Sequence, residues 1–368
     1  MTAWDEYFRG RGGVVFLSYC RFWERHGFVQ QSLARALARV GIPVDWLDGA
    51  GWRPYQPLLA PPVAGLSVGQ LFAPPGRRLS GIDRVATLLQ TRAIARRLAP
   101  GKRVVWVQAG IEEALARRLP WIDVFSVFDD PYRHDPAGPL CTKARAIVCQ
   151  NMLAYRRYAA VHPGKAQLLL PPVELPRPSP GATAGFPWPA GFPEKVVGYA
   201  GSFLGAGFDF TLARRFLELK SDWGVALVGR TDDAGEKAIS AELERHPRFV
   251  RFPWVSPDRL AGFYLRVKVT GLFYPRTPAQ DGAFAVKALE SLAHGVPVAG
   301  TKVPKTEGLA GTFPFAEGAE GVARAVEEAA AMPVGTVRDL FRRLEEQMRP
   351  EAHLDAVAGA LAPVMGHR

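Results

Sequence analysis

Cysteine is scarce in this sequence, and its few cysteines form no metal-binding pattern. The 368 residues include only Cys20, Cys141 and Cys149, with no C-x-x-C pair and no zinc-ligand spacing. The polar N-terminus also lacks the apolar core of a secretory signal. An odd number of cysteines without such a signal is typical of a reducing compartment. We therefore expect a cytoplasmic protein.

The sequence also lacks a segment suited to crossing a membrane. The uncharged stretch 54–76 is long enough, but it contains six prolines. Proline removes backbone hydrogen bonds from a helix, so we do not expect a continuous membrane-spanning helix here. We expect a Pro-rich surface loop, and a loop that touches apolar material is the alternative.

The marks of disorder, low hydrophobicity and very high charge, are absent too. Hydrophobic residues make up 48% of the chain and charged residues 22%, as in a soluble globular protein. A chain of 368 residues is longer than one hydrophobic core usually spans, so we expect two domains.

Acidic residues are scarce in the first half only. Residues 1–172 contain 23 of the 46 Lys and Arg residues and 12 of the 35 Asp and Glu residues, a net charge of +11. The remaining residues contain 23 of each and are neutral overall. A basic first half suits anionic lipid, an anionic acceptor or nucleic acid, and Arg-rich solvated helix faces explain it equally well. Since no basic-aromatic motif of a nucleic-acid reader is present, we expect no nucleic-acid partner.

Short apolar runs alternate with helical periodicity through the first half, which predicts a parallel, doubly wound sheet. Strands are predicted at 13–18, 44–47, 104–108, 124–128, 146–149 and 168–170, and helices at 28–40, 82–98, 112–118 and 153–160. The 82–98 helix is basic and amphipathic.

A second series of the same kind follows a stretch rich in Pro, Gly, Ala and Ser at 171–193, which is typical of a domain boundary. Strands are predicted at 196–200, 224–228, 249–252, 269–273 and 296–300, and helices at 210–219, 236–244, 257–265, 284–294, 321–331, 337–347 and 351–361. The two halves therefore predict two versions of one architecture.

One helix of the second half carries a charge pair that suits a nucleotide. Lys287 and Glu290 lie three residues apart, so they share one helix face. Lys is a point-charge partner for phosphate, and Glu accepts hydrogen bonds from the vicinal hydroxyls of a ribose. The pair predicts a nucleotide diphosphate ligand, and a plain ion pair is the alternative.

Three strand ends of the second half add candidates for donor binding. The run GYAGS ends in Gly201 and Ser202, whose small size lets backbone N–H groups approach a phosphate. Arg230 ends the next strand, where it either reaches a phosphate or is a solvated loop residue. Trp254 and Val255 follow the third strand, where a base can pack on the indole ring and meet the backbone. Trp254 as a core or interdomain aromatic is the alternative.

These elements, in this order, resemble the C-terminal domain of GT-B glycosyltransferases, family 4 above all. The resemblance covers residues 196–301: GYAGS resembles the phosphate loop, LVG and FPWVSPDRLAGFY resemble the next two strands and the base-binding turn, and VKALESLAHGVPVAGT resembles the ribose-binding helix and the following strand. It implies Glu290 on the ribose of a nucleotide-sugar, with Lys287 and the Gly201–Ser202 backbone on the diphosphate. It also implies that the last helix returns to the first domain.

Two positions depart from the family pattern. Many members carry a second Glu eight residues before the ribose Glu, where this sequence has Gly282. The basic residues that often follow the phosphate loop are absent from FLGAGFDF. Lys287 is expected to take over their role, as in a divergent subset that resembles bacterial glucuronosyltransferases of exopolysaccharide assembly. The donor sugar and the stereochemistry stay open.

The first half supplies candidates for the acceptor side. Asp129 and Asp130 follow a predicted strand, at the kind of strand end where α/β enzymes collect catalytic groups. A carboxylate there would deprotonate the acceptor hydroxyl in an inverting transferase. Asp130 is preferred, and Asp129 as the base or a turn-capping role for either residue is the alternative. The loop SYCRFWERHG adds the acceptor-side candidates Arg21, Trp23, Glu24 and His26, of which His26 is a second candidate base.

The predicted fold class is thus α/β, with two Rossmann-like, doubly wound parallel-sheet domains facing a cleft. The expected divisions are an acceptor-side domain at 1–172, a linker at 173–195, a nucleotide-sugar domain at 196–350 and a returning helix at 351–368.

The expected activity is transfer of a sugar from a nucleotide diphosphate, UDP by preference, to a hydroxyl of a glycan or lipid-linked acceptor in polysaccharide biosynthesis. We expect no cofactor and no metal, since the pairs Asp129-Asp130 and Asp232-Asp233 lack D-x-D spacing. The basic first half is expected to contact a membrane peripherally. The alternatives are a non-hydrolysing nucleotide-sugar epimerase and a degenerate, non-catalytic GT-B module.

Overall fold

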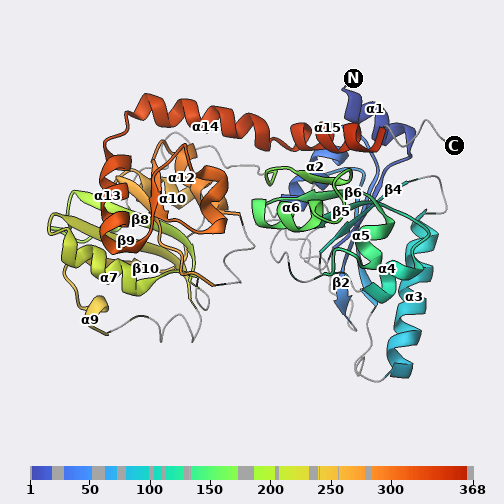
Figure 1. Cartoon of the computed structure of the whole chain (residues 1–368), viewed down its shortest axis with the longest axis horizontal. Helices are drawn as coiled ribbons and strands as arrows, with labels where there is room; N and C mark the ends of the chain where they lie inside the picture. Colours follow the sequence, from blue (N-terminus) through green and yellow to red (C-terminus); the bar gives the residue numbers. More distant parts are fainter. Residues whose placement is uncertain are drawn as a thin grey trace. The chain divides into compact units, whose positions relative to one another are not determined.

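The chain forms two compact units, which Figure 1 shows. The computed structural model describes residues 2–18, 29–51, 63–72, 80–98, 103–109, 111, 113–127, 132, 134–172, 186–203, 207–231, 239, 241–255, 257–277 and 284–362. The first unit consists of Met1–Glu174 and Glu346–Arg368, and the second of Leu175–Glu345.

The first unit is built on a seven-stranded parallel sheet with the order β3-β2-β1-β4-β5-β6-β7. Its strands are β1 (Val14–Leu17), β2 (Val44–Gly51), β3 (Leu66–Phe72), β4 (Val104–Gln108), β5 (Ile122–Val127), β6 (Ala144–Cys149) and β7 (Ala166–Leu168). The order reverses between β1 and β4, which is the switch point of a doubly wound sheet.

Helices cover both faces of this sheet because its strands are apolar on both sides. The helices are α1 (Ala3–Gly10), α2 (Val29–Arg39), α3 (Ser80–Leu98), α4 (Glu113–Arg118), α5 (Pro139–Lys143), α6 (Met152–Ala159) and α15 (Pro350–Leu361). Val14 and Phe16 of β1 share a core cluster with α1, α2 and α15. Val15 and Leu17 share the other cluster with α3, α4, α5 and α6. Successive strand residues therefore fill opposite cores.

The second unit has a six-stranded parallel sheet with the order β10-β9-β8-β11-β12-β13. Its strands are β8 (Lys195–Ser202), β9 (Trp223–Arg230), β10 (Phe249–Phe252), β11 (Val269–Leu272), β12 (Val298–Thr301) and β13 (Phe315–Ala316). Its helices are α7 (Phe210–Leu219), α9 (Ala241–Glu244), α10 (Pro257–Tyr264), α12 (Val286–Ala293), the 3₁₀ helix η1 (Pro304–Leu309) and α13 (Gly318–Ala330). The long helix α14 (Val334–Met348) contains the point of division between the units.

Aromatic rings from the end of the expected linker pack on the core of the second unit. Phe192 is buried there, and Phe186 and Trp188 pack against the same cluster. Trp188 stacks on Phe263 of α10, with ring centroids 5.5 Å apart and planes 7° from parallel. Residues 173–185 lie outside the described part of the chain.

The prediction of two parallel-sheet α/β domains is confirmed, but single elements differ from the sequence interpretation. The surface loop predicted at 54–76 contains β3, because Leu66–Phe72 is free of proline and pairs with β2 at the sheet edge. The helices α1 and α5 and the short strand β13 were not predicted. Among the described residues, no helix has both the length and the apolar character needed to cross a membrane.

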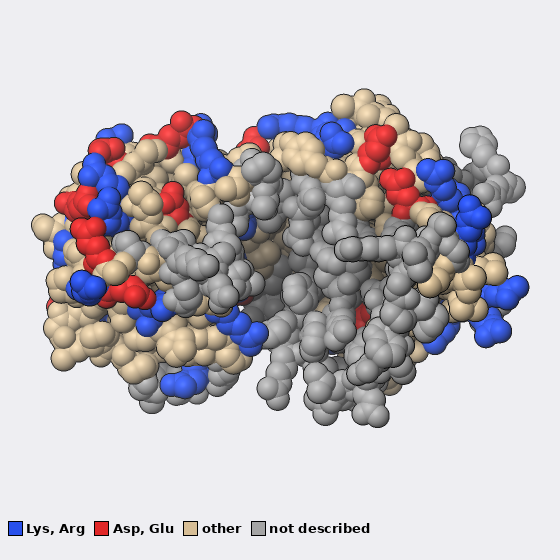
Figure 2. All heavy atoms as spheres, turned by 90° about the horizontal axis from the view of Figure 1, so that it is seen from below, with Lys and Arg blue, Asp and Glu red and all other residues tan. Residues whose placement is uncertain are grey.

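Charged side chains are distributed differently on the two units. Figure 2 shows acidic and basic side chains side by side on the second unit, drawn on the left, and mainly basic ones along the outer edge of the first unit on the right. This agrees with the net charge of +11 carried by residues 1–172.

Candidate functional site

The donor-binding candidates come from one edge of the second sheet and from the helix between two of its strands. All six strands are parallel, so they end at the same edge. Gly201 and Ser202 end β8, Arg230 ends β9, Trp254 and Val255 follow β10, and Lys287 and Glu290 lie on α12, between β11 and β12. The strand order reverses between β8 and β11, and open α/β sheets bind ligands beside such a reversal.

Glycines let the ends of β8 and β9 approach closely. Gly201 pairs with Gly229, and Ser202 pairs with Arg230. A Cβ atom on Gly229 would lie 1.6 Å from the carbonyl oxygen of Gly201, so no other residue fits there. The N–H of Phe203 donates to the carbonyl of Arg230 at 2.8 Å, which keeps the strand ends paired. The role of Gly201 and Ser202 toward a phosphate stays a prediction.

Arg230 and Trp254 meet at this edge although they come from different strands. The guanidinium carbon of Arg230 lies 4.9 Å from the centroid of the Trp254 ring, within cation–π range. Trp254 is 44% exposed, so it is not a core aromatic, and its role toward a base stays a prediction. Val255 packs partly against the core of the unit. An exposed indole beside a cation is suited to stacking on a base above a phosphate.

Lys287 and Glu290 form a half-buried ion pair. The Lys287 Nζ atom lies 2.9 Å and 3.1 Å from the two carboxylate oxygens of Glu290, and the side chains are 37% and 24% exposed. The two residues share one helix face as the spacing predicts. The pairing also fits the alternative of a plain ion pair, so the ligand roles of both residues stay predictions.

A buried serine fixes the rotation of α12 that presents this pair. The hydroxyl of Ser291 donates to the carbonyl of Val296 at 2.9 Å. It therefore accepts from the hydroxyl of Thr270, on β11, at 2.6 Å. Because Ser291 lies one turn after Lys287, on the same side of the helix, these bonds fix the rotation of the part of α12 that carries the pair.

Three buried tyrosines lie close to the Glu290 carboxylate. Burial raises the pKa of Tyr199 to about 12, and the negative charge of Glu290 adds to the rise. Burial and the same carboxylate hold the pKa values of Tyr264 and Tyr274 well above their usual range. The hydroxyls of Tyr199 and Tyr274 hydrogen-bond to each other. The three phenols therefore stay neutral beside the Glu290 charge.

Lys305 is a further cation at this edge, beside Arg230 and Lys287, that the sequence interpretation missed. It lies on η1, directly after β12, and its Nζ atom is 4.3 Å from the centroid of the Tyr274 ring. The negative charge of Glu290 in turn helps to raise the pKa of Tyr274. The signal in the sequence was the position of Lys305, just beyond the carboxyl end of a predicted strand.

The acceptor-side candidates lie outside the described residues. They are Asp129 and Asp130, and the loop residues Arg21, Trp23, Glu24 and His26. Their roles stay predictions. Within the described ranges, no three His, Cys, Asp or Glu side chains come together in a way that would hold a metal ion.

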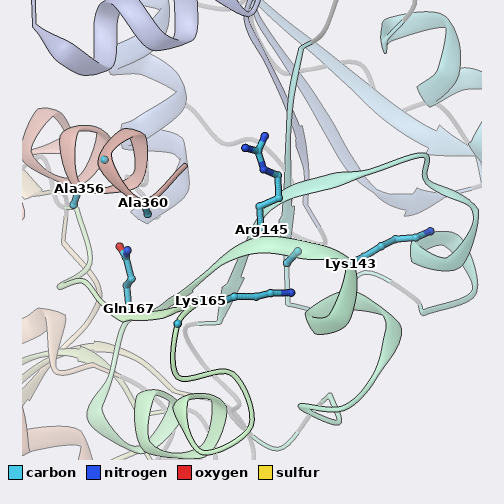
Figure 3. A pocket seen from close by; sticks show the side chains of 9 residues that line it. Lys143, Arg145, Lys165, Gln167, Ala356 and Ala360 are labelled. Atoms are coloured by element: carbon cyan, nitrogen blue, oxygen red, sulfur yellow. The ribbon is translucent and has the colours of Figure 1, made fainter. Parts of the chain in front are cut away.

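A separate hollow of about 700 Å³ lies in the first unit, where β6, β7 and α15 meet. Figure 3 shows Lys143 and Arg145 pointing apart rather than converging on it. Lys143 donates to three backbone carbonyls at and after the end of α4, and Arg145 donates to Asp123 and to the carbonyl of Leu361. These cations hold helix ends and strands, so the hollow is a structural feature rather than a donor site.

Comparison with solved structures identifies the fold. The chain is similar to a sucrose-phosphate synthase from Thermosynechococcus elongatus, with a TM-score of 0.67 and 16% identity over 96% of this chain and 98% of that one. The chain is also similar to HepE from Anabaena in complex with UDP, with a TM-score of 0.67 and 11% identity over 95% of this chain and 100% of that one. A third similar structure is the lipopolysaccharide outer core galactosyltransferase WaaB, with a TM-score of 0.66 and 13% identity over 94% of this chain and 99% of that one. Neither a protein-family model nor a curated protein sequence matches the chain.

At these identities the similarity establishes the architecture alone. It extends over nearly the whole chain, and it agrees with two all-parallel α/β units observed independently. The chain therefore has the GT-B fold of these glycosyltransferases.

Proposed function

We propose that this protein is a glycosyltransferase that moves a sugar from a nucleotide diphosphate to an acceptor hydroxyl. The observation that carries the proposal is the meeting of Arg230 and Trp254 at a strand edge of a GT-B fold. The half-buried pair of Lys287 and Glu290 on α12 supports it. UDP is the proposed nucleotide, because the similar HepE structure holds UDP.

Different residues of the candidate site would bind the ribose, the base and the diphosphate of the donor. Glu290 would accept hydrogen bonds from the ribose hydroxyls, and Trp254 would stack on the base beside Val255. Lys287 and Lys305, with the Gly201–Ser202 backbone, would bind the diphosphate. As the sugar bond breaks, negative charge grows on this leaving group, and fixed cations and N–H groups stabilise it. On donor binding, Lys287 would leave the Glu290 carboxylate and pair with a diphosphate oxygen instead.

The acceptor half of the reaction rests on the sequence. We propose Asp130, or else Asp129 or His26, as the base that takes the proton of the acceptor hydroxyl, and Arg21, Trp23 and Glu24 as further residues of the acceptor side. The acceptor would be a glycan or a lipid-linked sugar in polysaccharide biosynthesis, and no metal or cofactor would take part. The protein would work in the cytoplasm in peripheral contact with a membrane.

A calorimetric titration with UDP, GDP, ADP and dTDP tests the donor. We expect UDP to bind and Glu290→Gln to weaken it roughly tenfold or more, because a hydrogen bond to a charged group is lost. The matched control is Glu327→Gln, which removes another ion-paired glutamate of the second unit and leaves the affinity unchanged. Binding of none of the four nucleotides would overturn the proposal.

A ligand that lacks the ribose hydroxyls tests whether Glu290 contributes to UDP affinity through these hydroxyls. If Glu290 binds them, 2′,3′-dideoxy-UDP binds the unmodified protein more weakly than UDP does, and Glu290→Gln removes this difference. Equal discrimination by both proteins would contradict the ribose role.

Product analysis separates the alternatives. Turnover of a UDP-sugar to its epimer without an acceptor indicates an epimerase. Tight UDP binding with neither donor hydrolysis nor transfer indicates a non-catalytic module.

A further inference from the structure

Helix α3 of the first unit presents large apolar side chains to solvent. Val85 is 57% exposed, and Leu88 and Leu89 are each 42% exposed. Single exposed apolar residues are ordinary on protein surfaces. Elsewhere in the described chain, exposed large apolar side chains do not gather on one helix in this way.

These side chains form one continuous face with two arginines. A helix turns about 100° per residue, so Val85, Leu88, Leu89, Arg92 and Arg96 all fall within an arc of about 100°. All five are exposed. We call these five residues the outer face of α3. Its first half is apolar and its second half is basic.

The opposite face of α3 is firmly held by the rest of the unit. Ile94 and Leu98 are buried in the core cluster, and Ala86 is fully buried. Near the end of the helix, Arg97 donates to Asp45 of β2 at 2.8 Å and to Ser67 of β3 at 3.2 Å. Helix α3 is therefore a docked helix that is apolar on two sides, and the amphipathic character expected from the sequence is wrong.

From this face we infer that α3 docks the protein on an anionic phospholipid membrane. A lipid surface accepts apolar side chains and cations together, because leucines enter the acyl boundary while arginines reach the phosphate groups. Besides Arg97, which is paired with Asp45, helix α3 carries three arginines and, in Asp83, a single acidic residue. Figure 2 shows mainly basic side chains along the outer edge of this unit. A neutral protein partner would match the leucines but not this charge.

The inference assigns a surface to the proposed membrane contact and does not depend on sugar transfer, because binding to lipid needs neither donor nor acceptor. It thus stands or falls separately from the donor site. Electrostatic attraction to the surface also predicts that binding weakens as salt is added.

Sedimentation with vesicles tests the surface on the full chain. One vesicle set is phosphatidylcholine alone, and the other is an equimolar mixture of phosphatidylcholine and phosphatidylglycerol. We expect binding to the mixed vesicles only. Arg92→Gln with Arg96→Gln should weaken the partition constant roughly thirtyfold, and Leu88→Ser with Leu89→Ser should weaken it at least roughly tenfold.

A matched control removes the same charge from the second unit. Arg342→Gln with Arg343→Gln alters two exposed arginines of α14 and should leave vesicle binding unchanged. Circular dichroism and the melting temperature check that each variant is folded. We expect all variants to fold, because the replaced side chains are exposed.

Three results would overturn the inference. The first is no binding to the mixed vesicles. The second is an equal loss in the α14 control, which would indicate general charge rather than this face. The third is an unchanged partition constant in the leucine variant; if sedimentation velocity then shows that this variant has lost self-association, the face binds a second copy of the chain instead.

Discussion

Buried charge distinguishes the two units. Among the described residues, every buried aspartate and arginine belongs to the first unit: Arg35, Asp45, Asp48, Arg103 and Asp123. Apart from tyrosine, the buried polar side chains described in the second unit are the hydroxyls of Thr270, Ser291 and Thr306. Both units are parallel α/β sheets, so the difference is one of side chains and not of architecture.

In the first unit, part of the basic excess is used to hold the fold. Asp45 accepts from both Arg97 and the buried Arg103. Asp123 accepts from the N–H of Val105 at 2.9 Å and from Arg145 at 3.3 Å. Because a buried charge needs a partner, these cations are not free to meet a ligand.

In the second unit, aromatic packing replaces buried charge. Phe263 is fully buried and stacks on Trp188, while Lys287 and Glu290 stay partly exposed. A half-exposed ion pair exchanges partners at a smaller desolvation cost than a buried one. The comparison teaches that the first unit places part of its charge in its core, whereas the charges of the candidate site in the second unit lie at least partly at the surface.

Phe263→Ala should have the largest effect on stability, because it opens a cavity in the aromatic core of the second unit. Truncation of a buried Phe costs about 3–5 kcal/mol. Urea unfolding should show this loss, and Phe263→Leu should show a clearly smaller one. A loss below about 1 kcal/mol would indicate that aromatic packing does not hold this unit.

Asp45→Asn should cost about 3 kcal/mol in the free energy of unfolding, because it leaves the buried Arg103 without its anion. The control is Asp222→Asn, which breaks the exposed pair of Asp222 and Lys195 and should leave the unfolding curve unchanged. Equal effects of the two variants would break the comparison between buried and exposed pairs.

Local sequence signals predicted the bounds of an element correctly where the spacing of its apolar residues was regular and its ends were marked by capping or turn residues. Helix α7 matches its predicted bounds, because its apolar residues recur at helical spacing and Asp209 caps it by accepting from the N–H of Leu212 at 2.8 Å. Strand β10 matches as well. The cap of α7 depends on residues close in sequence.

Elements that depend on distant partners escaped prediction. Strand β3 lies between prolines and pairs with β2 at the edge of the sheet. Helix α1 is short and is held by packing against α15, from the other end of the chain. The contact of Lys305 with Tyr274 likewise joins residues after two different strands. Periodicity carries no information about such contacts.

The C-terminal helix should make the stability of the first unit sensitive to acid. Burial lowers the pKa of His353 on α15 to about 4, and its ring Nδ1 lies 3.3 Å from the Leu170 carbonyl. In the unfolded chain a histidine titrates near pH 6.5. Below about pH 6.5 the unfolded state binds a proton that the folded state does not, so stability is complete above this pH and is lost toward pH 4.

Denaturant unfolding at several pH values checks this slope. His353 should contribute a loss of about 1.4 kcal/mol per pH unit within that window, or about 2 kcal/mol at pH 5. His353→Asn should remove this part of the pH dependence while carboxylates elsewhere keep theirs. An identical slope in both proteins would show that His353 takes up its proton without leaving its site.

Trp254→Ala should have the smallest effect and should fall on ligand binding alone. The ring is 44% exposed and lies beside Arg230, so its removal opens no cavity and should leave the unfolding curve unchanged, in contrast to Phe263→Ala. Stacking on a base contributes about 1 kcal/mol at an exposed site, so UDP should bind roughly fivefold more weakly by calorimetry. Trp254→Phe should retain much of the affinity. If Trp254→Ala lowers stability but not affinity, this ring belongs with the aromatic core, and the separation of packing from ligand binding in the second unit fails at this residue.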